Sequence, residues 1–162
     1  MAEWSMLSAS NKAHQRVTDS MRDAQALVGC WELVSYTLTT ADGSVLFPMG
    51  ESPRGLLVYG STGELSVHLM QPGAEPPPAD SLPAGITPDL ALSYGCYSSY
   101  FGRYEVDEQR NEVTHFVQGA SVLGWAGAVF PRAYQLDNHQ LTLTAEANAQ
   151  GYAPALRWQR TG

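Results

Sequence analysis

The stretch of sequence that decides the fold is LVGCWELVSY, residues 27–36. Gly29 and Trp31 stand one residue apart, just before a segment in which apolar and polar residues alternate as they do in a β-strand. A long helical pattern precedes this stretch and a series of hairpin patterns follows it. Together these features indicate a closed β-barrel that is built to hold a molecule.

The segment before this stretch, residues 9–27, has the period of an amphipathic helix. Its apolar residues recur at spacings of three and four and share one face: Ala13, Val17, Met21, Ala24 and Val28. Ser10 or Asn11 is expected to cap it. We expect a helical extension over residues 1–26 and a barrel domain over residues 27–162. The helix is expected to pack against the domain, with binding of a partner as the alternative.

Short alternating segments separated by turn residues fill the rest of the chain. Turns are expected at Asp42-Gly43, residues 61–63, residues 107–111 and Asp137-Asn138. About eight short strands joined by tight turns favour an all-β, antiparallel up-and-down meander, and eight such strands usually close into a barrel.

One long connection interrupts the series of hairpins. Residues 71–88 contain six prolines and no periodicity, and a loop of this length inside a compact domain is usually functional or disordered. Residues 88–100 are expected to form a short helix, with Thr87 as its N-cap and Pro88 in its first turn.

Length and charge limit the class of protein. A chain of 162 residues with a formal net charge of −7 is expected to form one acidic domain. The acidity argues against nucleic acids and anionic membrane surfaces as partners, because both select clustered Lys and Arg. No signal peptide or membrane-spanning run is recognisable, so we expect a cytoplasmic protein. Cys30 and Cys96 form no CxxC motif and are expected to be free thiols, with a single disulfide between them as the alternative.

The Gly29-x-Trp31 motif resembles the signature of lipocalin and calycin barrels. In those folds the Trp closes the bottom of the barrel and a basic residue near the last strand lies across its ring. Arg157 and Arg160, in the terminal ALRWQR, are the candidates for that role here. A guanidinium over an indole face gains cation–π energy, so the arrangement is physically sound.

Four stretches together are similar to the bacterial and fungal lipocalin-like domain family: LVGCWELVSY, residues 42–72, YSSYFGRYEVDE and NEVTHFVQG. The likeness covers roughly residues 27–145 and departs from the family in the N-terminal helix and the proline-rich loop. It implies a small intracellular barrel, with relatives encoded among natural-product biosynthesis genes. It does not imply one particular reaction.

The sequence lacks the familiar signatures of cofactor binding, metal binding or nucleophilic catalysis. The histidines at positions 14, 68, 115 and 139 are scattered, so a metal site would require an improbable convergence. We therefore expect no metal and no cofactor.

The aromatic run YGCYSSYFGRY holds the most suggestive cluster. Tyr94, Tyr97 and Tyr100 recur every three residues, so on a helical turn they share a face. Such a helix across the barrel mouth would present three phenols to a ligand. The alternative is that these rings pack on the barrel rim as ordinary core.

Two histidines lie in alternating segments. His115 shares a strand face with Val113 and Val117, while His68 shares one with Ser66 and Met70. The alternation does not say which face is inside. An inward His115 would be a general acid or base in an apolar cavity; the alternative is a histidine satisfied by a neighbouring strand.

Arginine and tryptophan complete the candidate site. Arg103 shares a face with Glu105, and Arg132 shares one with Tyr134. An inward Arg is costly unless it meets an acid or an anionic ligand. Trp125, between two glycines, is expected to line the mouth or to fill the barrel.

These observations lead to a prediction of function. The expected catalytic residues are His115, Tyr97 and Arg132, and the expected ligand-binding residues are Tyr36, His68, Tyr94, Tyr100, Arg103 and Trp125. We predict a cofactor-independent cyclase or isomerase that acts on a hydrophobic polyketide- or terpenoid-like intermediate. The alternatives are a non-catalytic carrier of an apolar small molecule and an interaction protein, including a homodimer, that docks through its N-terminal helix.

Overall fold

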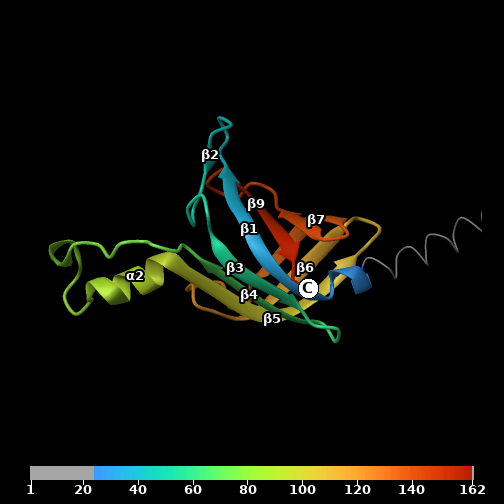
Figure 1. Ribbon diagram of the computed structural model, residues 1–162, viewed down its shortest axis with the longest axis horizontal. Coiled ribbons are helices and arrows are strands. Elements are labelled where there is room, and N and C mark those ends of the chain that lie inside the picture. The colour runs from blue at the N-terminus through green and yellow to red at the C-terminus, as the bar shows by residue number, and fades with distance from the viewer. Residues whose placement is uncertain (1–23, 162) are drawn as a thin grey trace, which may run out of the picture.

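The computed structural model describes residues 24–161, with backbone only for Ser93 and Tyr94 (Figure 1). The predicted N-terminal helix therefore lies outside the described residues, apart from a helical turn at residues 24–27. In the described part of the chain no helix is long and apolar enough to cross a membrane.

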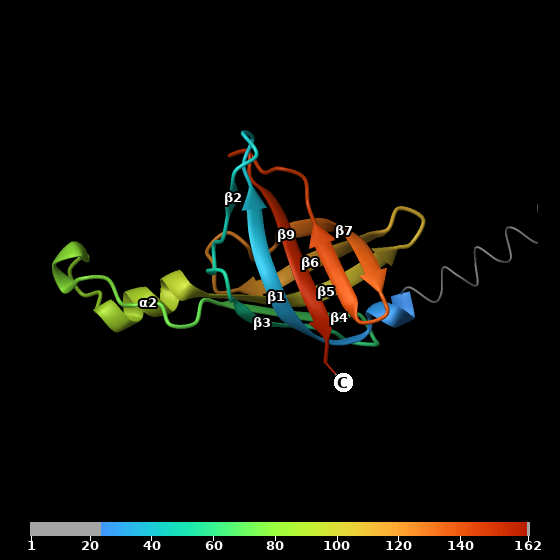
Figure 2. The ribbon, with the colours of Figure 1, turned by 45° about the horizontal axis from the view of Figure 1, so that its top comes forward.

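Residues 24–161 form one antiparallel sheet of nine strands. The strands are β1 Gly29–Thr39, β2 Val45–Leu46, β3 Arg54–Tyr59, β4 Glu64–Met70, β5 Tyr97–Asp107, β6 Glu112–Ala120, β7 Val129–Asp137, β8 Gln140–Thr144 and β9 Ala153–Arg160. Strand β1 pairs with both β3 and β9, so eight strands close a barrel, while β2 pairs only with the end of β1 (Figure 2). The predicted up-and-down barrel is confirmed, with one short extra strand.

The barrel closes because neighbouring segments of the chain pair at the expected turns. Residues 60–63 join β3 to β4, residues 108–111 join β5 to β6, and residues 138–139 join β7 to β8. The final pairing sets Trp31 opposite Arg160 and Tyr36 opposite Leu156. Local turns thus produce the meander, and among the described residues the pairing of β1 with β9 brings its first and last strands together.

Trp31 closes one end of the barrel. Its ring is fully buried, and its Nε1 donates to the carbonyl oxygen of Leu27 at 2.9 Å. The Arg160 guanidinium lies 4.1 Å from the centre of the indole ring and donates to the carbonyl oxygens of Ala26 and Val28. Of the two predicted candidates Arg160 therefore fills this role, whereas Arg157 is exposed.

Gly29 is required by this closure. Its φ of 133° is a conformation that L side chains rarely adopt, and an added Cβ would lie 2.9 Å from Arg160 Nη1. Glycine lets the chain turn into β1 directly beneath the arginine. The Gly-x-Trp spacing is thus explained by the contact between the first and last strands.

The prediction of a helix over residues 88–100 is wrong at its end. Helix α2 spans Pro88–Cys96, with Thr87 as its N-cap, and β5 begins at Tyr97. Tyr97 and Tyr100 therefore lie on a strand, where a spacing of three places side chains on opposite faces. Together with the 3-10 turn η1 (Ala79–Ser81), α2 projects beyond the end of the barrel in both ribbon views.

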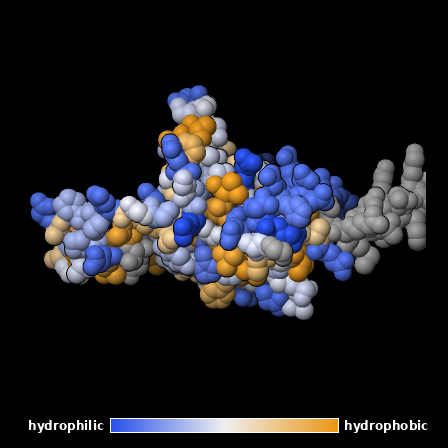
Figure 3. Space-filling model, viewed as in Figure 1, coloured by the Kyte–Doolittle hydropathy of each residue, from blue (hydrophilic) through white to orange (hydrophobic). Residues whose placement is uncertain are grey.

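The outer surface of the barrel mixes polar and apolar side chains (Figure 3). Val34, Leu56 and Phe101 are among its exposed apolar residues. Inside, the inward faces of the strands form one core, in which Leu57, Val113 and Leu141 are fully buried. This alternation directs one set of side chains toward the cavity described below.

Candidate functional site

The barrel encloses a cavity of about 380 Å³. Its walls are mostly apolar and aromatic, and they include Leu38, Leu57, Val67, Leu69, Trp125, Phe130, Leu143, Leu156 and Trp158. Polar side chains interrupt them at Tyr36, Tyr100, His115 and Arg132, while Glu146 and Asn148 line the cavity from the exposed connection between β8 and β9. The volume lies in the usual range of small-molecule pockets.

His115 on β6 is the centre of the polar group. The face that carries Val113, His115 and Val117 points inward, and His115 is only 1% exposed. Its Nε2 lies 2.7 Å from the Tyr59 hydroxyl oxygen, and its Nδ1 lies 2.9 Å from the Tyr100 hydroxyl oxygen. Both ring nitrogens are thus engaged by tyrosines on other strands of the barrel.

Burial determines the protonation of this group. Desolvation, assisted by the positive charge of Arg132, lowers the pKa of His115 to about 3, so the imidazole is neutral at physiological pH. Desolvation also raises the pKa of Tyr100 to about 12 and the pKa of Tyr59 well above its ordinary value. At neutral pH the cluster consists of two protonated phenols and a neutral imidazole.

Three aromatic rings form the wall beside this cluster. Trp125, Tyr100 and Phe130 meet edge to face, with ring centres 5.6 to 5.9 Å apart. Edge-to-face rings hold each other in place, because the positive edge of one meets the negative face of the next. Trp125 therefore lines the cavity as an ordered part of the loop between β6 and β7.

Arg132 on β7 places a positive charge at the cavity. Its guanidinium carbon lies 5.0 Å from the centre of the Phe130 ring, and its Nη1 donates to the Pro131 carbonyl oxygen at 3.0 Å. Among residues 24–161 no carboxylate forms an ion pair with it. Its charge is felt in the cavity, because it opposes the effect of burial on the pKa of Tyr36 and of Tyr100.

Tyr36 reaches the cavity through an irregularity in β1. The β1–β9 register shifts between Leu33 and Ser35, so that Leu33 pairs with Trp158 and Tyr36 pairs with Leu156. Trp31 and Leu33 face inward before this bulge, and Tyr36 and Leu38 line the cavity after it. Without the extra residue Tyr36 would face outward.

Three predicted site residues lie away from the cavity. His68 is on the outer face of β4, because Leu65, Val67 and Leu69 occupy the inner one. Its Nδ1 lies 2.5 Å from the Tyr97 hydroxyl oxygen. Arg103 is exposed and donates to the Thr62 carbonyl oxygen at 2.9 Å.

The alternation therefore correctly grouped His115 with Val113 and Val117, and His68 with Ser66 and Met70, but it did not identify the inner face. Tyr36, Tyr100, His115, Trp125 and Arg132 come together at the cavity, whereas Tyr97, His68 and Arg103 do not. The Tyr94 side chain lies outside the described residues.

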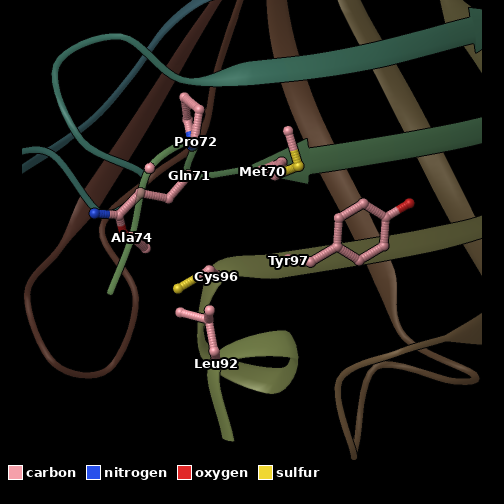
Figure 4. Close-up of a pocket in the computed structure, with 8 residues that line it drawn as sticks. Met70, Gln71, Pro72, Ala74, Leu92, Cys96 and Tyr97 are labelled. Carbon is pink, nitrogen blue, oxygen red and sulfur yellow. The ribbon is translucent and has the colours of Figure 1, made fainter. Parts of the chain in front are cut away.

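A second pocket lies outside the barrel, where the proline-rich segment passes α2 (Figure 4). It is lined by Met70, residues 71–74, Leu92, Cys96 and Tyr97, and is mostly apolar. Cys96 and Cys30 are both free thiols, as expected. In the described part of the chain no group of three or more His, Cys, Asp or Glu residues is placed to hold a metal ion.

Tyr59 is the residue of the buried hydrogen-bond cluster that sequence reasoning missed. It is 1% exposed, and 56 residues separate it from His115, its hydrogen-bond partner. The RGLLVYG segment shows only that Tyr59 shares a face with Leu57. Its position beside His115 depends on barrel closure, which no local pattern records.

An antiparallel eight-stranded barrel with one end closed by tryptophan and arginine, around an apolar cavity, defines a lipocalin-type architecture. In agreement, the sequence profile of the lipocalin-like domain matches residues 28–161. The chain belongs to this family of lipocalin-like domains.

Comparisons with individual proteins add little to this assignment. Among solved structures, the chain is similar to the crystal structure of a mutant of the fluorescent protein UnaG, with 11% sequence identity and a TM-score of 0.37. The match covers 83% of this chain and 95% of that one. No curated protein matches the sequence. The cytoplasmic location and the homodimer stay predictions.

Proposed function

We propose that the barrel binds a small hydrophobic molecule in the cavity, with the polar group of the ligand against Tyr100 and Arg132. The observation that carries the proposal is the cavity of about 380 Å³, which is apolar along most of its wall and has Tyr100 and Arg132 among its polar lining residues. A ligand that buries about 300 Å² of apolar surface there would gain roughly 7 kcal/mol from the hydrophobic effect. A micromolar dissociation constant corresponds to about −8.2 kcal/mol, and association itself is costly, so contacts of the ligand with Tyr100 and Arg132 must add to this gain.

The first test is native mass spectrometry of the full chain purified from its own host, with identification of any retained molecule. Retention of a hydrophobic metabolite supports the proposal. The retained molecule then becomes the probe for a matched pair of variants. Leu156→Trp fills the cavity, because Leu156 lines it, and Leu56→Trp adds the same bulk to an exposed site on β3.

We expect Leu156→Trp to weaken binding more than tenfold and Leu56→Trp to leave it unchanged. If no metabolite is retained, 1-anilinonaphthalene-8-sulfonate serves as the probe, and the same comparison applies. Equal binding by both variants would place the ligand outside the barrel and contradict the proposal.

A second candidate is a cofactor-independent cyclase or isomerase that acts on a polyketide- or terpenoid-like substrate. The observation that favours it is that two donors, the Tyr100 hydroxyl and the Arg132 guanidinium, line the same cavity. Such a site would hold a flexible substrate folded and polarise its carbonyl oxygen. Tyr97 has no part in this proposal, because its hydroxyl contacts His68 on the outer face.

In this candidate His115 is a positioning residue and not a proton carrier. Its two nitrogens are both hydrogen-bonded, and its pKa of about 3 keeps it neutral. If the retained molecule is cyclic, incubation with its acyclic precursor tests turnover. We expect Tyr100→Phe and Arg132→Gln to slow conversion at least tenfold. Unchanged turnover in both variants would refute the catalytic candidate and leave the binding function.

A further inference from the structure

Tyr59, His115 and Tyr100 form a chain of hydrogen bonds, and the tautomer of His115 sets the direction of donation along it. A neutral imidazole carries one N–H donor and one acceptor nitrogen. Since both nitrogens of His115 have a tyrosine hydroxyl within hydrogen-bond distance, one tyrosine must donate to the ring and the other must accept from it. The two possible tautomers of His115 give the chain opposite directions.

The buried end of the chain selects one tautomer. Tyr59 is 1% exposed and does not line the cavity, and its hydroxyl has His115 as its hydrogen-bond partner among the described residues. If His115 carried its proton on Nε2, the Tyr59 oxygen would accept a hydrogen bond from Nε2–H. The hydroxyl hydrogen of Tyr59 would then be buried without an acceptor. A buried donor without an acceptor is costly. Tyr59 therefore donates to Nε2, and the ring proton sits on Nδ1.

The other end of the chain then follows. Nδ1–H donates to the Tyr100 oxygen, so the Tyr100 hydroxyl hydrogen is left to point away from the imidazole. Tyr100 lines the cavity, where this hydrogen can meet a ligand. Each donated bond polarises the next, so the terminal hydroxyl becomes a stronger donor than an isolated phenol.

Arg132, like the Tyr100 hydroxyl, presents hydrogen-bond donors to the cavity. A guanidinium has donors and no acceptor, and this one lines the cavity without forming an ion pair with an acid among residues 24–161. The neighbouring Trp125 indole likewise can only donate. The other polar groups of the lining are the Tyr36 hydroxyl, which can donate or accept, and Glu146 and Asn148, which are on the exposed connection between β8 and β9.

Building on the proposed binding function, we propose that the polar group of the ligand is an anionic oxygen acceptor of the carboxylate class, held by the Tyr100 hydroxyl and the Arg132 guanidinium, and that Tyr59 sets this preference through the tautomer of His115. At Tyr100 and Arg132 a ligand whose polar group is an ammonium meets two donors and a positive charge, so it binds more weakly than a carboxylate; the carboxylate of the described lining, Glu146, is on the exposed connection between β8 and β9. A neutral ketone is accepted more weakly.

The tautomer is measured first, by long-range ¹H–¹⁵N correlation NMR of the full chain, with the His115 signals assigned by their loss in His115→Gln. The wild type is expected to show a protonated Nδ1 and an unprotonated Nε2. In Tyr59→Phe the Nε2 atom of His115 lacks its partner in either tautomer. Neither tautomer is then selected, so a mixture is expected. A merely structural role for Tyr59 would leave the tautomer unchanged.

The ligand class is measured next, by calorimetric titration with dodecanoate, dodecan-2-one and dodecylammonium, which share one chain length. A hydrogen bond to a charged group is the stronger kind, so we expect dodecanoate to bind about ten- to a hundredfold more tightly than the ketone. Dodecylammonium should bind most weakly. Tyr100→Phe and Arg132→Gln should each reduce the preference for dodecanoate at least tenfold, whereas Tyr97→Phe, an outer-face control, should keep it.

The outcomes separate this inference from the function beneath it. A wild-type His115 protonated on Nε2, or equal affinity for the three probes, overturns the inference while the barrel remains a ligand-binding protein. Failure of all three probes to bind contradicts the proposed function, and with it the inference that rests on it.

Discussion

Replacing His115 with leucine tests the buried hydrogen-bond chain directly. Leucine has a similar volume but offers no acceptor to the Tyr59 hydroxyl, which lies 2.7 Å from His115 Nε2 and is 1% exposed. A buried hydroxyl without a partner costs about 1–3 kcal/mol of stability. Tyr100 loses the same partner, but it lines the cavity and can meet water there, so its loss is smaller.

His115→Leu is combined with Tyr59→Phe in a double-mutant cycle. In the wild type it removes a donor from Nε2 and should destabilise the protein by about 1–2 kcal/mol. In the His115→Leu background it removes the unpartnered hydroxyl and should stabilise the protein by about 1–3 kcal/mol. The same substitution is therefore expected to change sign, which a simple loss of packing would not produce.

The assay is urea unfolding of all four proteins, followed by tryptophan fluorescence. A change of 2 kcal/mol moves the unfolding midpoint by roughly 1 M urea for a protein of this size. Tyr97→Phe, whose hydroxyl lies on the outer face, serves as the matched control and should shift the midpoint little in either background. A Tyr59→Phe effect of one sign in both backgrounds would refute the reasoning.

The remaining predictions concern pH and the closed end of the barrel. His115 has a pKa of about 3 in the folded protein against an ordinary value of 6.5, so the unfolded chain binds the additional proton between these values. The part of the unfolding free energy that depends on a neutral His115 is fully present above pH 6.5 and is lost as the pH falls toward 3, by at most about 1.4 kcal/mol per pH unit. His115→Leu should flatten this slope in acid-unfolding curves. An unchanged slope would contradict the buried neutral imidazole. Arg160→Gln should lower the unfolding free energy by about 1–3 kcal/mol and alter Trp31 fluorescence, because the variant loses the cation–π contact and two carbonyl partners. Arg157→Gln, at an exposed position, should change the unfolding free energy by less than about 0.5 kcal/mol. Gly29→Ala should cost about 1–3 kcal/mol in the same unfolding assay, because its φ is 133° and its Cβ would meet Arg160, and a neutral result would mean that the chain does not need this conformation.

Local patterns determined most of the fold. Alternation marked the strands, and turn residues marked where β3 meets β4 and where β5 meets β6. Because an antiparallel meander pairs neighbours in sequence, these local signals were enough to predict a barrel. The Gly29-x-Trp31 motif and the terminal arginines also predicted how one end would be closed.

The error in the tyrosine cluster arose because a spacing of three was interpreted with the period of a helix, whereas part of the segment is a strand with a period of two. Tyr94, Tyr97 and Tyr100 share a face on a helix, but the helix ends at Cys96. On β5 the same spacing of three separates Tyr97 and Tyr100, so that one lies outside and the other lines the cavity. Residue spacing has functional meaning only once the type of element is known.

Within a regular strand the sequence by itself determined which residues share a face, since that depends only on the period of two. Which face is inside was decided by the tertiary structure, because burial depends on how the whole sheet curls. The bulge that turns Tyr36 inward and the closure that brings Tyr59 to His115 belong to the same class of fact. The bulge belongs to the pairing of β1 with β9, and the Tyr59–His115 contact is made across the barrel interior between β3 and β6, which do not pair. Contacts between segments so distant in the chain leave no local signature in either strand.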